Sequence, residues 1–304
     1  MNAHDSAALD ASTTPRKGWF KRLVAQEDLN FLLTNRVPRI ALTRMMGRFS
    51  RIESPALTKL TIAVWRWFIP LDLSEAKHTN FRSLKDCFTR ELKPGARVFD
   101  MRPEVFASPS DAIVGATGVV HQGQVYQAKG FPYSTEELFG PTQDASAFEG
   151  GRFVTLRLTS AMYHRFHAPA DGTVEHVTYL SGDTWNVNPV ALKRVERLFC
   201  RNERAVVRMT LASGHAIALV PVAAILVASI RLHFLDVLLH LGLKLESKGA
   251  NEMPCNAPHV KGQEMGWFEH GSTIIVFVPP GFELAEGIAP GVQIRAGQAL
   301  LKLS

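Results

Sequence analysis

The chain has 304 residues, of which 46% are hydrophobic and 20% charged, so it can bury one large core or two smaller ones and is not a disordered protein. Its three cysteines, Cys87, Cys200 and Cys255, are odd in number and form no CxxC pair, which argues against a disulfide framework and favours a reducing, cytoplasmic setting. The longest apolar run, residues 217–230, is too short to cross a bilayer, and the first residues lack the pattern of a signal peptide. We therefore expect neither a transmembrane span nor secretion.

The net charge of +6 is concentrated at the front of the chain. Residues 1–70 hold 11 Lys and Arg against 5 Asp and Glu, and the rest of the chain is balanced. Residues 1–18 are small and polar and are expected to form a disordered tail. Residues 19–75 predict short amphipathic helices, separated at Pro38 and at Ser54-Pro55, with arginines between the apolar positions.

The last of these helices predicts contact with a membrane surface. It gathers aromatic and basic side chains of the kind that in-plane membrane helices use. The expected contact residues are Trp65, Trp67, Phe68, Lys59 and Arg66. Simple packing of the helices on the core is an alternative that the sequence leaves open. Nucleic acid is not expected, because no groove-binding or RNA-binding motif accompanies the charge.

Residues 76–304 predict a strand-rich core with a few helices, so the expected fold class is α+β. Ser83 predicts a helix that runs to about Leu92, and Ser134 with Glu137 predicts a second one that Gly140 ends. Alternating residues predict strands near 154–158 and 207–211. The apolar runs 217–230 and 272–279 predict buried strands, and residues 291–304 a turn and a last strand.

Three places hold residue types that could act together. They are Asp111, the pair His164 and His167, and Ser272. An aspartate can orient a histidine that removes the proton of a serine hydroxyl, although any chain of this length contains such a trio by accident. A metal site built from His164, His167 and His176 is not expected, because the spacing fits no zinc motif and no carboxylate completes it.

Ser272 follows Gly271, and this pair suggests a reaction other than hydrolysis. The segment does not match the GxSxG elbow of a serine hydrolase. Glycine leaves its carbonyl open and allows left-handed backbone conformations, so the serine hydroxyl can attack that carbonyl and shift the acyl group from nitrogen to oxygen. Elimination from the ester then cuts the chain and leaves dehydroalanine, which hydrolyses to an N-terminal pyruvoyl group.

The chain resembles the phosphatidylserine decarboxylase family of the prokaryotic type over almost its whole length. The segments that carry the resemblance are FTRELKPGAR (88–97), ASPSDAIVGATG (107–118), QAKGFPYSTEELFG (127–140), YHRFHAPADG (163–172), LFCRNERAVV (198–207) and KGQEMGWFEHGST (261–273). The conjunction of YHRFH with a later KGQEMGxF and GST is specific to this family.

The resemblance implies a self-cleaving enzyme. Asp111, His167 and Ser272 would form the self-cleavage triad, and the cut between Gly271 and Ser272 would give a β chain of residues 1–271 and an α chain of 272–304. The pyruvoyl group at position 272 would be the only cofactor, and it would form a Schiff base with phosphatidylserine, whose loss of CO₂ gives phosphatidylethanolamine. His164 would assist the decarboxylation.

The resemblance also implies partners and a location. The expected partners are phosphatidylserine, an anionic membrane surface and the protein's own α and β chains, with a homodimer of these left open. The expected location is peripheral, on the cytoplasmic face of the inner membrane. Two positions depart from the family pattern: His270 stands where leucine is usual, and Ala112 where glycine is usual. These departures bear on processing rate or substrate more than on the class of reaction.

Three alternatives stay open at this point. The first is a pyruvoyl decarboxylase of this family that acts on another amino acid or serine lipid. The second is a catalytically inactive, lipid-binding relative, although such a protein would have no need of the triad. The third is a serine hydrolase that uses the same three residues and leaves the polypeptide uncut.

Overall fold

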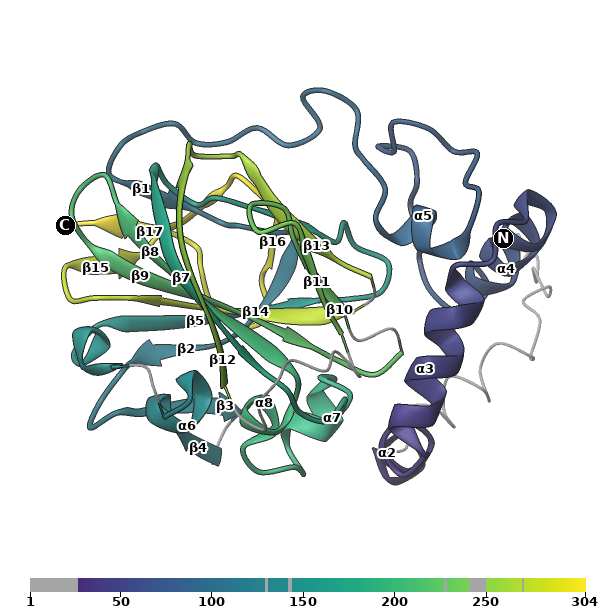
Figure 1. Ribbon diagram of the computed structural model, residues 1–304, viewed down its shortest axis with the longest axis horizontal. Helices are drawn as coiled ribbons and strands as arrows, with labels where there is room; N and C mark the ends of the chain where they lie inside the picture. The colour runs from purple at the N-terminus through teal and green to yellow at the C-terminus, as the bar shows by residue number, and fades with distance from the viewer. Residues whose placement is uncertain (1–26, 129–130, 142–143, 227–228, 241–249, 270) are drawn as a thin grey trace, which may run out of the picture.

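The computed structural model describes residues 27–128, 131–141, 144–226, 229–240, 250–269 and 271–304. Three helices lie beside a body of β-strands, and the C-terminus lies on the far side of that body (Figure 1). Helices followed by strand-rich antiparallel sheets confirm the predicted α+β class. The expected tail of residues 1–18 falls outside the described residues.

The helical front consists of α2 (Glu27–Asn35), α3 (Arg39–Ser50) and α4 (Pro55–Trp65). Its breaks lie where the prolines predict them. The Ser54 side chain caps α4 by accepting a hydrogen bond from the Leu57 amide, and Pro55 occupies the first helical position, where no amide proton is needed. No helix in the described part of the chain is long and apolar enough to span a bilayer.

The helix that Ser83 begins is shorter than the sequence predicts. Helix α5 (Leu84–Phe88) is capped by Ser83 as expected, but it ends four residues before Leu92. The following residues are extended instead, because their backbone pairs with residues 75–77: the Lys77 amide donates to the Glu91 carbonyl and the Lys93 amide to the Glu75 carbonyl, both at 2.9 Å. Long-range pairing thus overrides the local helical pattern.

An antiparallel sheet of eight strands forms the body. In spatial order its strands are β12 (Ala250–His259), β7 (Gly172–Leu180), β8 (Arg204–Leu211), β9 (Ala216–Ala223), β14 (Ser272–Val278), β5 (Arg152–Leu158), β2 (Ala112–Val119) and β16 (Gln293–Ile294). Three smaller sheets accompany it. The first has four strands, in the order β11 (Val237–His240), β10 (Ser229–Leu232), β13 (Glu264–Phe268) and β6 (Arg165–His167). The second has three, in the order β1 (Val105–Ala107), β17 (Ala299–Leu303) and β15 (Phe282–Leu284). The third pairs β3 (Gln124–Ala128) with β4 (Phe131–Ser134).

The apolar run 217–230 forms two strands where the sequence predicts one. Strand β9 pairs with β8 and β14 in the large sheet, whereas β10 pairs with β11 and β13 in a smaller sheet. Both strands are buried, so hydrophobicity alone gives no sign of the change of sheet between them.

Two apolar cores lie on the two faces of the large sheet. Along β14, Ile274 and Val276 contribute to the core that the sheets of β10 and of β17 cover, and Ile275 and Phe277 to the core on the opposite face, which the β3–β4 pair joins. Short helices lie over that opposite face (Figure 1). They are α6 (Thr135–Phe139), η1 (Ser146–Phe148), α7 (Pro189–Leu192) and α8 (Leu198–Arg201). Burial on both faces explains why the sequence of β14 is continuously apolar.

Candidate active site

Ser272 lies at the first position of β14, in the middle of the large sheet. It pairs with Leu158 of β5 on one side and with Ala223 of β9 on the other. Strand alternation directs its side chain to the face that carries Ile274, where it is 1% exposed. Its hydroxyl has no hydrogen-bond partner among the described residues. A buried hydroxyl without a partner is costly, and such groups occur at reactive sites.

Gly271 has room for a side chain. A Cβ placed on it would meet the Leu158 carbonyl oxygen at 3.5 Å, an ordinary contact. Packing therefore does not require glycine here, and the open carbonyl before Ser272 is the feature that glycine supplies. His270 falls outside the described residues, so its effect on processing stays a prediction.

The hydrogen bonds of the His167 ring fix its tautomer. Nδ1 lies 2.9 Å from the Gly262 carbonyl oxygen, which can only accept, so Nδ1 carries the proton. Nε2 then has the lone pair and accepts a hydrogen bond from the Tyr163 hydroxyl at 3.1 Å. Burial lowers the pKa of His167, because it disfavours the charged imidazolium. The ring is therefore a neutral base at neutral pH.

Asp111 is buried just before β2 and forms an ion pair that the sequence does not predict. Its carboxylate accepts from the Arg97 Nε at 2.7 Å and from a second Arg97 nitrogen at 2.5 Å, and it also accepts from the Ala296 amide at 2.9 Å. The aspartate lies near His167, because the His167 amide donates to the Pro109 carbonyl. In this structure, however, the Gly262 carbonyl orients the imidazole, and Asp111 contributes a fixed negative charge.

His164 has different surroundings from His167. It is fully buried, and its ring packs edge-on against Phe88 of α5 with the ring centres 5.8 Å apart. The His167 ring instead contacts Phe99 and Tyr163. The third histidine of the metal alternative, His176, is bonded to Glu252 between β7 and β12.

Two cavities share residues 159 and 160 in their walls. One of about 430 Å³ contains Asp111, Arg97 and Tyr163 in its wall, and the other, of about 230 Å³, contains Gly271. Thr159 and Ser160 line both. Asp111 and Gly271 thus lie at the two sides of one loop, the connection between β5 and β6.

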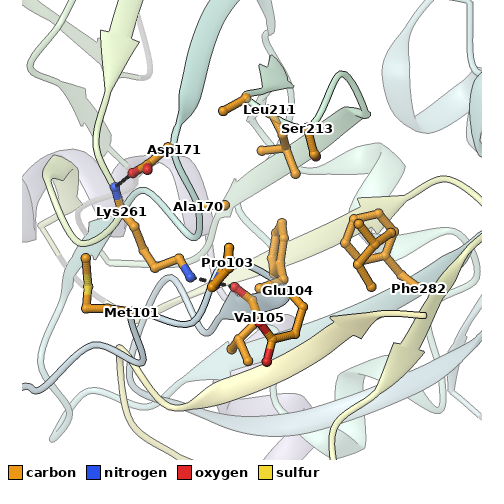
Figure 2. A pocket seen from close by; sticks show the side chains of 13 residues that line it. Met101, Pro103, Glu104, Val105, Ala170, Asp171, Leu211, Ser213, Lys261 and Phe282 are labelled. Carbon is orange, nitrogen blue, oxygen red and sulfur yellow. Dashed lines mark hydrogen bonds between the residues drawn. The ribbon is translucent and has the colours of Figure 1, made fainter.

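Lys261 lines a third cavity, of about 320 Å³. It precedes Gly262, whose carbonyl is hydrogen-bonded to the His167 ring. Figure 2 shows the Lys261 ammonium directed at the Val105 carbonyl. The same ammonium donates to the carbonyls of Asp100 and Arg102, at 3.1 and 2.6 Å. These bonds hold the turn whose Gly262 carbonyl orients His167. Sequence reasoning gave Lys261 no role, although it opens the segment KGQEMG.

The aromatic residues expected at a membrane differ in exposure. Trp67 is 80% and Phe68 60% exposed, and Lys59 and Arg66 are also exposed. Trp65 is half-buried, because its ring packs edge-on against Phe88. Since Phe88 also contacts the His164 ring, α5 lies between α4 and the candidate site.

A buried ion triad joins the helical front to the segment before Gly271. Glu269 has no exposed side-chain surface and follows β13 directly. One of its carboxylate oxygens lies 3.0 Å from an Arg51 nitrogen, just after α3, and the other 2.8 Å from the Lys85 ammonium of α5. No pattern in the sequence predicts this contact, because the three residues are far apart along the chain.

Comparison with known proteins shows the family of the chain. A family profile described as phosphatidylserine decarboxylase matches residues 84–302. The phosphatidylserine decarboxylase proenzyme of Shewanella amazonensis is 35% identical over 281 residues, covering 88% of this chain and 96% of its own. That of Shewanella frigidimarina is 35% identical over 290 residues, covering 91% and 99%. The chain belongs to the phosphatidylserine decarboxylase family.

Proposed function

We propose that the chain is a phosphatidylserine decarboxylase, made as a proenzyme that cleaves itself between Gly271 and Ser272. The observation that carries this proposal is the Ser272 hydroxyl, buried without a partner among the described residues at the start of β14, within a chain of this family. The product of decarboxylation is phosphatidylethanolamine.

In the proposed self-cleavage, His167 acts as the base on the Ser272 hydroxyl. The Gly262 carbonyl keeps the proton on Nδ1, so Nε2 is free of a proton and can receive one. Tyr163 occupies Nε2 in this structure and must yield that position to the serine. Asp111, fixed by Arg97, favours the imidazolium that forms, because its negative charge raises the pKa of His167 against the effect of burial.

Ser272 fits the pyruvoyl group that the family uses. The serine is the source of the group, and its buried place at the head of β14 excludes water. The group supplies a carbonyl that condenses with the substrate amine and withdraws electrons as CO₂ leaves. We assign to His164 the transfer of a proton to the substrate carbon that loses CO₂, since its ring is buried against Phe88 and His167 is already bonded to Tyr163.

The helical front is proposed to bring the enzyme to its lipid substrate. Trp67 and Phe68 are exposed beside Lys59 and Arg66, and each basic residue near an anionic leaflet contributes about 1 kcal/mol. This supports peripheral attachment to the cytoplasmic face of the inner membrane through residues 19–75, with 76–304 as the catalytic core. A homodimer of the α and β chains belongs to the same proposal.

The first test is an intact mass spectrum of the purified protein beside its Ser272→Ala variant. We expect two chains that divide between Gly271 and Ser272, the smaller one with a carbonyl-reactive blocked end, and an uncut variant. A single unmodified chain from folded protein would contradict the proposal and favour the inactive relative or the hydrolase.

The second test separates the two histidines. His164→Ala is expected to cut itself almost normally yet to lose decarboxylation, whereas His167→Ala is expected to stay uncut. Gel analysis reports cutting, and release of labelled CO₂ from phosphatidylserine reports turnover. Equal loss of both steps in His164→Ala would contradict this division of roles.

A further inference from the structure

Arg157, near the end of β5, lines the cavity that contains Gly271 and has no anionic partner among the described residues. It pairs across the sheet with Thr273, the residue after Ser272. Its side chain is half-buried, and its guanidinium makes no hydrogen bond or ion pair with any residue in the part of the chain that the structure describes. Burial lowers the pKa of Arg157, and no carboxylate offsets that loss of solvation. An anion in the cavity would stabilise this charge.

The arginines of the neighbouring cavity are already engaged. Arg97 is bound to Asp111 and Glu75. Arg295 is bound to the second oxygen of Glu75 at 3.0 Å. Arg90 donates to backbone carbonyls, including those of residues 161 and 162. Among these four arginines around the β5–β6 connection, Arg157 is the one that binds neither a carboxylate nor a carbonyl of the described residues.

The rest of the cavity wall suits a phosphoester and faces the helical front. Thr159, Ser160 and Asn186 add polar groups to it. The Asn186 amide donates to the Asn35 side chain of α2, and the amide of Leu226, another wall residue, donates to the Thr43 hydroxyl of α3 at 3.1 Å. The cavity therefore lies against the helices that we propose to rest on the membrane, from which a lipid headgroup would enter.

We propose that Arg157 binds the phosphate of the substrate headgroup beside the reacting position 272. This inference rests on the proposed function and deepens it. Phosphate is the better assignment than the substrate carboxylate, because phosphate keeps its charge through the reaction, whereas a cation that holds the carboxylate would stabilise the ground state against loss of CO₂. A phosphate site also distinguishes a serine phospholipid from free serine, which lacks that group.

Binding is tested on the uncut chain, so that the result does not depend on decarboxylation. The Ser272→Ala protein is titrated with glycerophosphoethanolamine, inorganic phosphate and serine by isothermal calorimetry. We expect glycerophosphoethanolamine to bind best and to lose about 10- to 100-fold in affinity when Arg157→Gln is added. Arg152→Gln, at the other end of the same strand and outside the cavity, is the matched control and should bind normally.

Three outcomes would overturn the proposal. Equal affinity with and without Arg157→Gln would show that the guanidinium does not bind the ligand. Tighter binding of serine would assign Arg157 to the carboxylate. Equal binding of inorganic phosphate and glycerophosphoethanolamine would indicate a site for free phosphate instead of a headgroup.

Kinetics of the cut enzyme separate this inference from the proposed function. With a short-chain phosphatidylserine, Arg157→Gln is expected to raise KM about tenfold or more with a smaller change in kcat, and Arg157→Lys, which keeps the charge, to recover part of the loss. The fraction of chain that is cut reports folding in each variant. If the unaltered chain is cut but does not decarboxylate the lipid, the proposed function fails, whereas an unaltered KM in Arg157→Gln contradicts this inference alone.

Discussion

The chemistry at His167 depends on a backbone carbonyl that holds its proton. The Gly262 carbonyl fixes Nδ1–H, and Lys261 fixes the turn that carries this carbonyl through three backbone acceptors. The predicted triad has Asp111 as the partner of His167, but here the carboxylate is held by Arg97. A charge fixed in place can still favour the imidazolium without a direct hydrogen bond.

The pH dependence of self-cleavage follows from the lowered pKa of His167. Because burial disfavours the imidazolium, the neutral base persists below the ordinary histidine pKa of about 6.5. We expect the rate to be constant near neutral pH and to fall only below that value. Freshly translated chain, moved into buffers between about pH 5 and about pH 8 and followed by gel, gives the profile.

His176→Gln is the matched control for this profile, since His176 lies on β7, bonded to Glu252 away from the site. His176→Gln should leave the fall of the rate at acid pH unchanged. If the rate of self-cleavage in the unaltered chain falls to half at a pH above the ordinary histidine pKa, His167 is not the neutral base of the reaction.

Glu203 predicts a second, independent dependence on pH, in stability. Burial raises the pKa of Glu203 from 4.5 to about 7, although the Tyr179 hydroxyl that donates to it favours the carboxylate. Between these values the folded chain keeps a proton that the unfolded chain releases, so stability falls as the pH rises, by about 3 kcal/mol if the full shift applies. Glu203→Gln should remove this decline.

The measurement is urea unfolding of the uncut Ser272→Ala chain at about pH 5 and about pH 8, with and without Glu203→Gln. Glu175→Gln, which alters an exposed glutamate of β7, is the control and should keep the decline. Parallel pH profiles for the Glu203 variant and its parent would contradict the prediction.

At the scale of elements, the helical front and the cleavage segment are joined through Glu269. Its carboxylate is buried, whereas Arg51 is 48% and Lys85 32% exposed, so the two cations can turn toward water if the carboxylate is lost. We therefore expect Glu269→Gln to cost about 1–3 kcal/mol of stability, less than a fully buried pair would. Displacement of the segment before Gly271 should also slow self-cleavage about tenfold or more.

A time course of cutting after translation, with urea unfolding of the uncut chain, measures both effects of Glu269→Gln. Arg51→Ala should also slow cutting, because it removes one of the two cations that pair with Glu269. Arg48→Ala, an exposed arginine of the same helix α3, is the matched control and should cut at the normal rate. Normal cutting in Glu269→Gln would show that the triad does not position the cleavage segment.

At the scale of the whole molecule, β14 explains how two chains remain one enzyme after cleavage. The proposed α chain begins with β14, which stays paired along its length with β5 and β9 of the β chain. Its side chains reach both cores, so separation would expose apolar surface on both faces of the sheet. The cut removes one peptide bond but none of this pairing.

The proposed membrane attachment also belongs to the scale of the whole molecule, because it requires the exposed aromatic residues on a folded front. Trp67→Ser with Phe68→Ser should weaken sedimentation with vesicles that contain phosphatidylserine by about tenfold or more, since their apolar surface no longer inserts. Self-cleavage should be unchanged. Val98→Ser with Met101→Ser, exposed apolar residues outside the front, is the control. Equal vesicle binding by both double variants would contradict the assignment.

Local sequence signals predicted much of the fold. Ser83 and Ser134 cap helices where expected, Gly140 ends α6 with a positive φ, and the apolar run after Ser272 is a strand buried on both faces. These features depend on neighbours a few residues apart, so the sequence determines them directly. The end of α5 and the division of the run 217–230 depended instead on distant strands and could not be predicted locally.

The sequence by itself determined which residue types are present for chemistry: a glycine before a serine, two histidines and an aspartate in segments that resemble one family. Only the tertiary structure decided their partners. In the folded chain Asp111 forms an ion pair with Arg97, and His167 is hydrogen-bonded to Gly262 and Tyr163. Glu269 is buried between two cations. Arg157 lies beside Gly271 with no anionic partner among the described residues. The physical reason is that hydrogen bonds and ion pairs depend on distances of a few ångströms between residues far apart in sequence, which no local pattern encodes.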